Sequence, residues 1–194
     1  MKVAVLCEYS GTVRDAFIAV GHKAISCDLL PTESPGPHIQ GDCLQYDWSE
    51  YDLIIAHPPC TYLCVPGAHY LHKQKDRWSK MLLAKEFFYK IFNMKNKMLC
   101  IENPVPHKYA ALPKYSQIIH PWQFGHEAKK RTCLWLKNLP LLQPTNIVGK
   151  GEHYIRKDGS VSNAKWYAKA SAKERAKTFP GIAFAMAEQW GRLK

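Results

Sequence analysis

Short apolar runs alternate with helical patterns between residues 1 and 110, and this alternation limits the fold more than any other feature. The runs KVAVLC, KAISC, DLIIA and KMLCI have the length of strands, and segments 12–22 and 77–92 repeat apolar residues at helical spacing. In the first helical segment Val13, Phe17 and Val20 share one face, and Gly21 favours a helix end. This alternation predicts an α/β fold with a doubly wound, mostly parallel sheet.

The pattern changes after residue 110. Segments 116–125 and 130–139 each hold a short strand-like run, which predicts an antiparallel strand pair, and segment 179–193 has a helical pattern. Residues 149–177 lack apolar periodicity and carry eight Lys or Arg against three acidic residues. We therefore expect a single domain over residues 1–194, in which residues 145–178 form a short basic insertion that faces the substrate.

The charge balance favours a polyanionic partner. The 194 residues include 27 Lys or Arg and 16 Asp or Glu, which gives a formal net charge of +11 and a pI near 9.3. Nucleic acid fits this balance best, although Lys-rich surfaces also serve solubility. The seven cysteines have no CxxC spacing, so we expect neither a disulfide framework nor a structural metal site. No apolar stretch has the length of a signal peptide core or a membrane span, so we expect a cytoplasmic protein without a membrane partner.

A pair of prolines ends the apolar run at residues 53–56. The prolines at 58–59 cannot donate to a sheet ladder and fix a stiff turn, which puts Cys60 just beyond a strand. Glu102 and Asn103 follow another apolar run in the same way, and open α/β sheets bind ligands at such strand ends. Partial burial would favour protonated Glu102, and a thiol beside a proton-donating acid suits nucleophilic attack on a ring. A loop cysteine and a helix-capping glutamate are the alternative interpretations.

Other polar positions follow the first strands of the predicted sheet. The turn CEYSG at residues 7–11 separates the first strand from the first helix, where this architecture binds a nucleotide-like cofactor. Asp28 ends the second apolar run and suits ribose hydroxyls, and Asp42 in the segment GDC could meet an adenine amino group. The pattern GxGxxG is absent, so NAD is not expected. Each acid by itself also fits a solvated loop or a helix cap.

Together these motifs resemble those of the DNA cytosine-5 methyltransferases and, more narrowly, of their short phage- or prophage-type members. HPPC at 57–60 resembles the Pro-Cys nucleophile motif, IENP at 101–104 the Glu-Asn motif, and segment 7–28 the S-adenosylmethionine-binding opening. Segment 124–136 stands in the place of a basic motif, and segment 179–191 resembles the last cofactor-side helix. The resemblance implies a Rossmann-like class I methyltransferase fold, S-adenosylmethionine as cofactor, and DNA methylation as activity.

The resemblance also implies residue roles. Cys60, held by the turn at Pro59, would attack C6 of cytosine, and Glu102 would protonate or hydrogen-bond N3. Asn103 would support the loop that holds Cys60. The implied cofactor residues are Glu8, Tyr9, Ser10 and Gly11 at the methionine part, Asp28 at the ribose, and Leu29, Asp42 and Cys43 around the adenine. Lys130 or Arg131 would lie near the base or a phosphate. Within the basic insertion, Lys165, Trp166 and Lys169 suit phosphate contacts and base stacking.

Two departures from the family's pattern leave the substrate open. The basic motif reads KKRT in place of two arginines, and the basic insertion stands where the family carries a large target-recognition domain. We expect methyl transfer to C5 of cytosine in DNA, with duplex and single-stranded DNA both open. The alternatives are a free cytidine nucleotide as substrate, and a protein of this fold that binds nucleic acid or protein with little turnover. A phage-encoded protein would act in the cytoplasm of its host cell.

Overall fold

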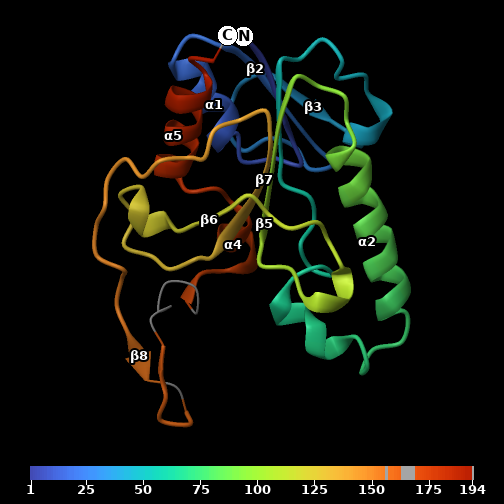
Figure 1. The fold of residues 1–194 in the computed structure, drawn as a ribbon, viewed down its shortest axis with the longest axis vertical. Coiled ribbons are helices and arrows are strands. Elements are labelled where there is room, and N and C mark those ends of the chain that lie inside the picture. The colour runs from blue at the N-terminus through green and yellow to red at the C-terminus, as the bar shows by residue number, and fades with distance from the viewer. Residues whose placement is uncertain (156, 163–168, 194) are drawn as a thin grey trace.

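The computed structural model describes residues 1–155, 157–162 and 169–193, arranged as Figure 1 shows. In these residues seven strands form one sheet in the order β3-β2-β1-β4-β5-β7-β6. They are β1 (Lys2–Leu6), β2 (Lys23–Asp28), β3 (His38–Gln40), β4 (Leu53–Ala56), β5 (Met98–Pro104), β6 (Gln117–Ile119) and β7 (Thr132–Lys137). Strands β1 to β5 pair in parallel, and β7 runs antiparallel to both β5 and β6. The predicted sheet, mostly parallel with an antiparallel pair near its C-terminal end, is confirmed.

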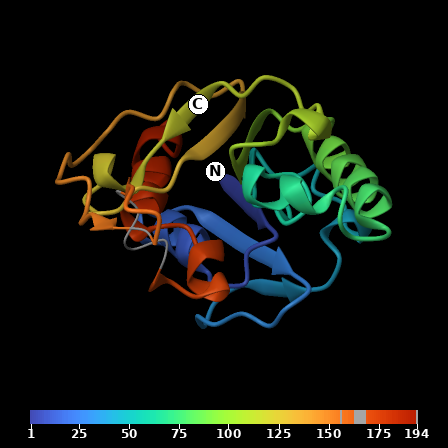
Figure 2. The ribbon, with the colours of Figure 1, turned by 90° about the horizontal axis from the view of Figure 1, so that it is seen from below.

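Helices cover both faces of this sheet. α1 (Thr12–Ala19) and α5 (Pro180–Trp190) lie on one face and α2 (Arg77–Phe92) on the other, as Figure 2 shows from below. Side chains of the central strands alternate accordingly, because Val5 packs into the core with α1 and α5 whereas Leu6 packs into the core with α2. Burial on both faces explains why these strands read as continuous apolar runs.

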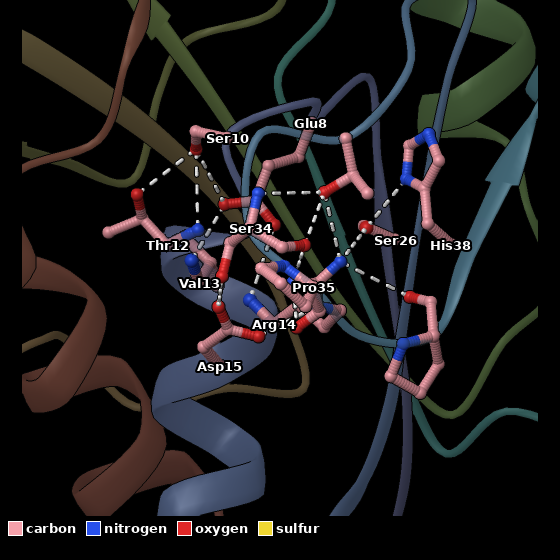
Figure 3. Close-up of polar contacts among 12 residues, drawn as sticks. Glu8, Ser10, Thr12, Val13, Arg14, Asp15, Ser26, Ser34, Pro35 and His38 are labelled. Carbon is pink, nitrogen blue, oxygen red and sulfur yellow. Dashed lines mark hydrogen bonds and ion pairs between the residues drawn. The ribbon is translucent and has the colours of Figure 1, made fainter.

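α1 carries a buried charge that its apolar spacing does not reveal. The guanidinium of Arg14 is fully buried and donates to the hydroxyls of Ser26 and Thr32 and to three carbonyls of residues 34–37 (Figure 3). Gly11 leaves room for it, since a Cβ there would lie 2.5 Å from the Arg14 Nη2 atom. These charge-assisted hydrogen bonds offset the desolvation of Arg14 and fix the loop between β2 and β3.

Short elements complete the described chain. The 3-10 helices are η1 (Cys43–Gln45), η2 (Val65–Tyr70), η3 (Lys108–Ala110) and η4 (Pro121–Gln123). In the basic insertion, β8 (Tyr154–Ile155) and β9 (Val161–Ser162) form a two-stranded hairpin, and α4 (Ala172–Ala176) follows. Lys165 and Trp166 lie outside the described residues. None of the helices in the described ranges has both the length and the apolar character needed to cross a membrane.

Candidate active site

A pocket of ≈ 280 Å³ opens at the carboxyl ends of the parallel strands, and we call it the cleft. Its lining comes from four parts of the chain: Cys7, Tyr9, Asp28 and Leu30; residues 57–61; Glu102 and Pro104; and Lys130, Arg175 and Ala176. Strand pairing accounts for this meeting, because Ala56 at the end of β4 pairs with Ile101 of β5. The sequence-predicted residues Cys60, Pro59, Glu102, Tyr9, Asp28 and Lys130 therefore line one cleft.

The turn that carries Cys60 is tied to β5 through Asn103. The Asn103 Nδ2 atom donates to the Pro58 carbonyl at 3.0 Å, and the Cys64 thiol donates to the Asn103 Oδ1 atom at 3.1 Å. The Cys64 thiol lowers the pKa of Cys60 to about 7, and the Lys130 charge acts in the same direction, against burial and the Glu102 carboxylate. Much of Cys60 is therefore thiolate near neutral pH, which is the nucleophilic form.

Glu102 contacts His57 across the two strand ends. The His57 Nδ1 atom lies 2.8 Å from the Glu102 Oε2 atom, and each side chain is 9% exposed. Burial raises the pKa of Glu102, but the Lys130 charge and the His57 contact together outweigh burial and hold this pKa below its ordinary value. Burial therefore favours the protonated form of Glu102, as expected, but Lys130 and His57 beside the carboxylate reverse the net direction.

His57 is a cleft residue that the sequence interpretation missed. Its Nε2 atom is buried and has no hydrogen-bond partner among the described residues, and its side chain lines the cleft. The sequence feature that could have identified His57 is its position between the end of β4 and the two prolines, at the same strand end as Cys60.

Lys130 reaches the cleft from the segment before β7. Its side chain is buried, and the Nζ atom donates to the carbonyls of Arg175 at 2.9 Å and Lys177 at 3.3 Å. Strand β7 positions Lys130, because Thr132 pairs with Pro104 at the end of β5. The structure thus separates the two predicted base or phosphate contacts: Lys130 lines the cleft, whereas Arg131 is exposed and lines a different pocket.

The turns after β1 and β2 form the other side of the cleft. Tyr9, Asp28 and Leu30 line it, and the Asp28 Oδ1 atom accepts a hydrogen bond from the Leu30 backbone N–H at 2.9 Å. In the part of the chain that the structure describes, the Asp28 Oδ2 atom has no partner. Leu29 is 71% exposed and does not line the cleft. The acceptor expected for a ribose is therefore available at the cleft, next to Leu30.

The Glu8 carboxylate stabilises the turn between β1 and α1 through hydrogen bonds. Its carboxylate accepts the backbone N–H groups of Val13 at 2.6 Å and Arg14 at 3.2 Å, at the start of α1 (Figure 3). The Ser10 hydroxyl donates to the same carboxylate at 3.3 Å, and Gly11 has a φ of 75°, in the left-handed region. A carboxylate at a helix N-terminus stabilises the helix, so these residues shape the turn.

Glu8, Ser10 and Gly11 do not line the cleft, and neither do Asp42, Cys43 and Lys169. The Asp42 Oδ1 atom accepts the Leu44 backbone N–H at 3.0 Å, which caps η1. Cys43 is buried with its sulfur 4.0 Å from that of Cys7, and Lys169 is exposed. All seven cysteines are free thiols, and within the described ranges no three His, Cys, Asp or Glu side chains group in a way that could hold a metal ion.

Residues 173–178, which we call the closing segment, cross the turn after β1. The Lys173 Nζ atom lies 2.5 Å from the Glu33 Oε1 atom, and Lys177 pairs with the other Glu33 oxygen. The Tyr9 hydroxyl donates to the Lys173 carbonyl at 3.2 Å. Between the closing segment and residues 7–10 a gap of ≈ 10 Å³ remains, so this segment covers the turn closely.

Comparisons with known proteins give a likeness of fold. Neither protein-family models nor curated proteins match the chain. A solved structure of a candidate DNA modification methyltransferase from an E. coli prophage is similar, with a TM-score of 0.50, 13% identity, and coverage of 77% of this chain and 52% of that one. A methyltransferase of Entamoeba histolytica has a TM-score of 0.47 and 13% identity over 76% of this chain and 57% of its own. The chain therefore spans only about half the length of the first of these proteins. With the strand order of its sheet, this likeness identifies the fold as the methyltransferase-like Rossmann fold.

Proposed function

We propose that this chain is an S-adenosylmethionine-dependent methyltransferase that transfers a methyl group to C5 of cytosine in DNA through a covalent adduct at Cys60. The observation that carries the proposal is the meeting of Cys60 and Glu102 in one cleft. They come from the ends of neighbouring parallel strands, and the same cleft continues to Tyr9 and Asp28. Cys60 as nucleophile, Glu102 as acid and Asp28 as hydrogen-bond acceptor would then contact a cytosine base and a cofactor bound together in the cleft.

The residues on the β1–β2 side fit S-adenosylmethionine. The available Asp28 Oδ2 atom suits ribose hydroxyls, Leu30 offers an apolar contact, and Tyr9 with the turn at residues 8–11 would contact the methionine part. When bound, the cofactor supplies an electrophilic methyl group. The Asp42 carboxylate caps η1 and does not line the cleft, so it would not contact the adenine amino group.

Cys60 would form the bond to C6 of cytosine. Its lowered pKa, about 7, supplies thiolate at neutral pH, and the tie between Asn103 and Pro58 keeps the sulfur in place without a flexible hinge. As the C6–S bond forms, N3 gains electron density and needs a proton. After methylation a solvent water would take the C5 proton, the C6–S bond would break to return Cys60 as thiolate, and N3 would give its proton back to Glu102.

The proton for N3 would be delivered by Glu102, which lines the cleft. Because the pKa of Glu102 is lowered, this carboxyl group is ionised before the base binds, and it would take up a proton from solvent as the base enters. Glu102 would then donate this proton to N3 as the C6–S bond forms. His57 is a positioning residue, since its Nδ1 atom lies 2.8 Å from the Glu102 Oε2 atom and orients the carboxyl group.

A mechanism-based probe tests the proposal. Oligonucleotides with 5-fluorocytosine lack the C5 proton that must leave, so methylation should leave the base attached to the protein. Intact-mass analysis is expected to find one adduct per chain, only when S-adenosylmethionine is present, and peptide mapping should assign it to Cys60.

Cys64 is the internal control, because it lies four residues further along and is buried. Cys60→Ser should abolish the adduct. An adduct on Cys64, or no adduct with any cytosine substrate, would refute the proposed chemistry.

A further inference from the structure

A second pocket, which we call the basic pocket, lies next to the cleft. It has a volume of ≈ 450 Å³ and is lined by His120, Trp122, Lys129, Arg131 and Lys150. Its residues come from η4, from the segment before β7, and from the start of the basic insertion. None of the residues proposed for cofactor or nucleophile chemistry lines it.

The basic pocket has a positive potential. Three of its five lining side chains are permanent cations, and none is acidic. Among the described residues, Lys129, Arg131 and Lys150 form no salt bridge; Glu127 is the acid nearby, 3.5 Å from where a Cβ of Gly149 would lie. Burial lowers the pKa of His120, and the three cations lower it further, which reports the same potential.

Two aromatic rings, those of His120 and Trp122, line the basic pocket, and backbone hydrogen bonds fix the segments that carry them. The Lys150 Nζ atom lies 5.0 Å from the Trp122 ring centroid, and the His120 ring is stacked at 6.0 Å from it. The Val148 N–H donates to the Trp122 carbonyl at 2.9 Å, and the His120 N–H donates to the Gln123 side chain at 2.7 Å. Because the Lys150 ammonium lies over the half-buried Trp122 ring, a base that stacks on this ring would displace Lys150 towards the phosphate of the same nucleotide.

The two pockets share one wall. Lys130 lines the cleft, and its chain neighbours Lys129 and Arg131 line the basic pocket. Because these three residues are consecutive, the two pockets lie on either side of one short segment of the chain. A strand whose target base enters the cleft would pass this segment and bring a flanking nucleotide to the basic pocket.

We propose that the basic pocket binds the nucleotide adjacent to the target base in an unpaired nucleic acid strand. Lys129, Arg131 and Lys150 contact its phosphate, and Trp122 stacks on its base. The inference rests on the proposed function for the identity of the base in the cleft, and it selects a strand over a free nucleotide as substrate. DNA and RNA share this chemistry, so both are compared in the test.

Binding without methyl donor tests the proposal apart from chemistry. Fluorescence anisotropy would compare labelled single-stranded DNA, the same RNA, and the DNA duplex, with dCMP as a competing ligand. In the double variant Lys129→Gln/Lys150→Gln, the Kd for the single strand should rise at least about tenfold, and the slope of log Kd against log salt should fall by about 1.4. Trp122→Leu should weaken the same strand by about 5-fold to 100-fold. Binding of dCMP should not change in either variant.

The matched control is Lys90→Gln/Lys97→Gln, which removes the same charge at the end of α2 and just before β5, away from the carboxyl ends of the strands. Its salt slope should stay within about 0.3 of the wild-type slope. An unchanged slope in the Lys129→Gln/Lys150→Gln variant, equal weakening of dCMP, or duplex binding as tight as single-strand binding would overturn the proposal. Strand binding with these variant effects but no fluorocytosine adduct would instead refute the proposed function and leave the basic pocket standing.

Discussion

The two sides of the cleft are held in different ways. On the catalytic side, His57, Cys60 and Glu102 stand on neighbouring strands and are joined by buried contacts of 2.8–3.1 Å through Asn103 and the His57–Glu102 pair. On the opposite side, the closing segment is held by the exposed ion pair of Lys173 with Glu33, in which Lys173 is 65% exposed, and by buried Lys130, which donates to the carbonyls of Arg175 and Lys177.

The two kinds of contact differ in how much free energy is lost when they break. Breaking a buried hydrogen-bond network leaves polar groups unsatisfied at about 1–3 kcal/mol each, whereas exposed ion pairs contribute about 0–1 kcal/mol. The ion pairs of Glu33 with the closing segment should therefore break more easily than the contacts of the catalytic side.

The largest effect is expected from Glu102→Gln. Methyl transfer should fall by about 10²–10⁴-fold, the usual contribution of a general acid, while cofactor affinity is retained. The pKa of Glu102 lies below its ordinary value of 4.5, so the carboxylate stabilises the fold above that pH and loses this contribution as the pH falls through its folded value. Urea unfolding below pH 4.5 should therefore be less pH-dependent in the variant. Glu86→Gln, at an exposed ion pair of α2, is the control; an equal loss of activity there would contradict the role of Glu102.

Asp28→Ala tests the cofactor side beneath the closing segment. Loss of hydrogen bonds to a charged acceptor should weaken S-adenosylmethionine by about 1.5–3 kcal/mol in calorimetry. Asp42→Ala is the matched variant, because that carboxylate caps η1 and does not line the cleft, and it should have the smaller effect on affinity. Unchanged affinity in Asp28→Ala would show that Asp28 does not bind the ribose of the cofactor.

Cys64→Ala should raise the pKa of Cys60. The Cys64 thiol is the largest cause of the lowered value, and without it burial and the Glu102 charge oppose thiolate formation. Alkylation of Cys60 by iodoacetamide, followed by mass spectrometry, should have its midpoint near pH 7 in the wild type and at higher pH in the variant. Identical midpoints would mean that the thiols do not interact.

The smallest effect on stability is expected from Glu33→Gln, which removes the ion pairs of the closing segment. The free energy of unfolding should change little, and by a similar amount in the control Glu50→Gln, which loses an exposed pair with Lys2. Only Glu33→Gln should speed cofactor association and dissociation in stopped-flow measurements. Equal rates in both variants would mean that the closing segment does not limit access.

Local sequence patterns predict every strand of the main sheet except β3, together with the order in which these strands follow along the chain. The apolar runs predicted β1, β2, β4 and β5, Gly21 and the two prolines at 58–59 predicted where elements stop, and α2 has the bounds that its spacing predicts. These features depend on local sterics and on periodicity, which a single chain reveals. The positions of Cys60 and Glu102 at strand ends follow from the same signals.

The charge, cover and extent of the site depend on contacts between parts of the chain that are distant in sequence. The lowered pKa of Glu102 depends on Lys130, which antiparallel β7 brings to the end of β5. The closing segment joins residues 33 and 177, which are 144 positions apart, and the basic pocket joins η4 to Lys150. Such pairings have no local signal, because Coulomb interactions and burial depend on distance in space and not on separation along the chain.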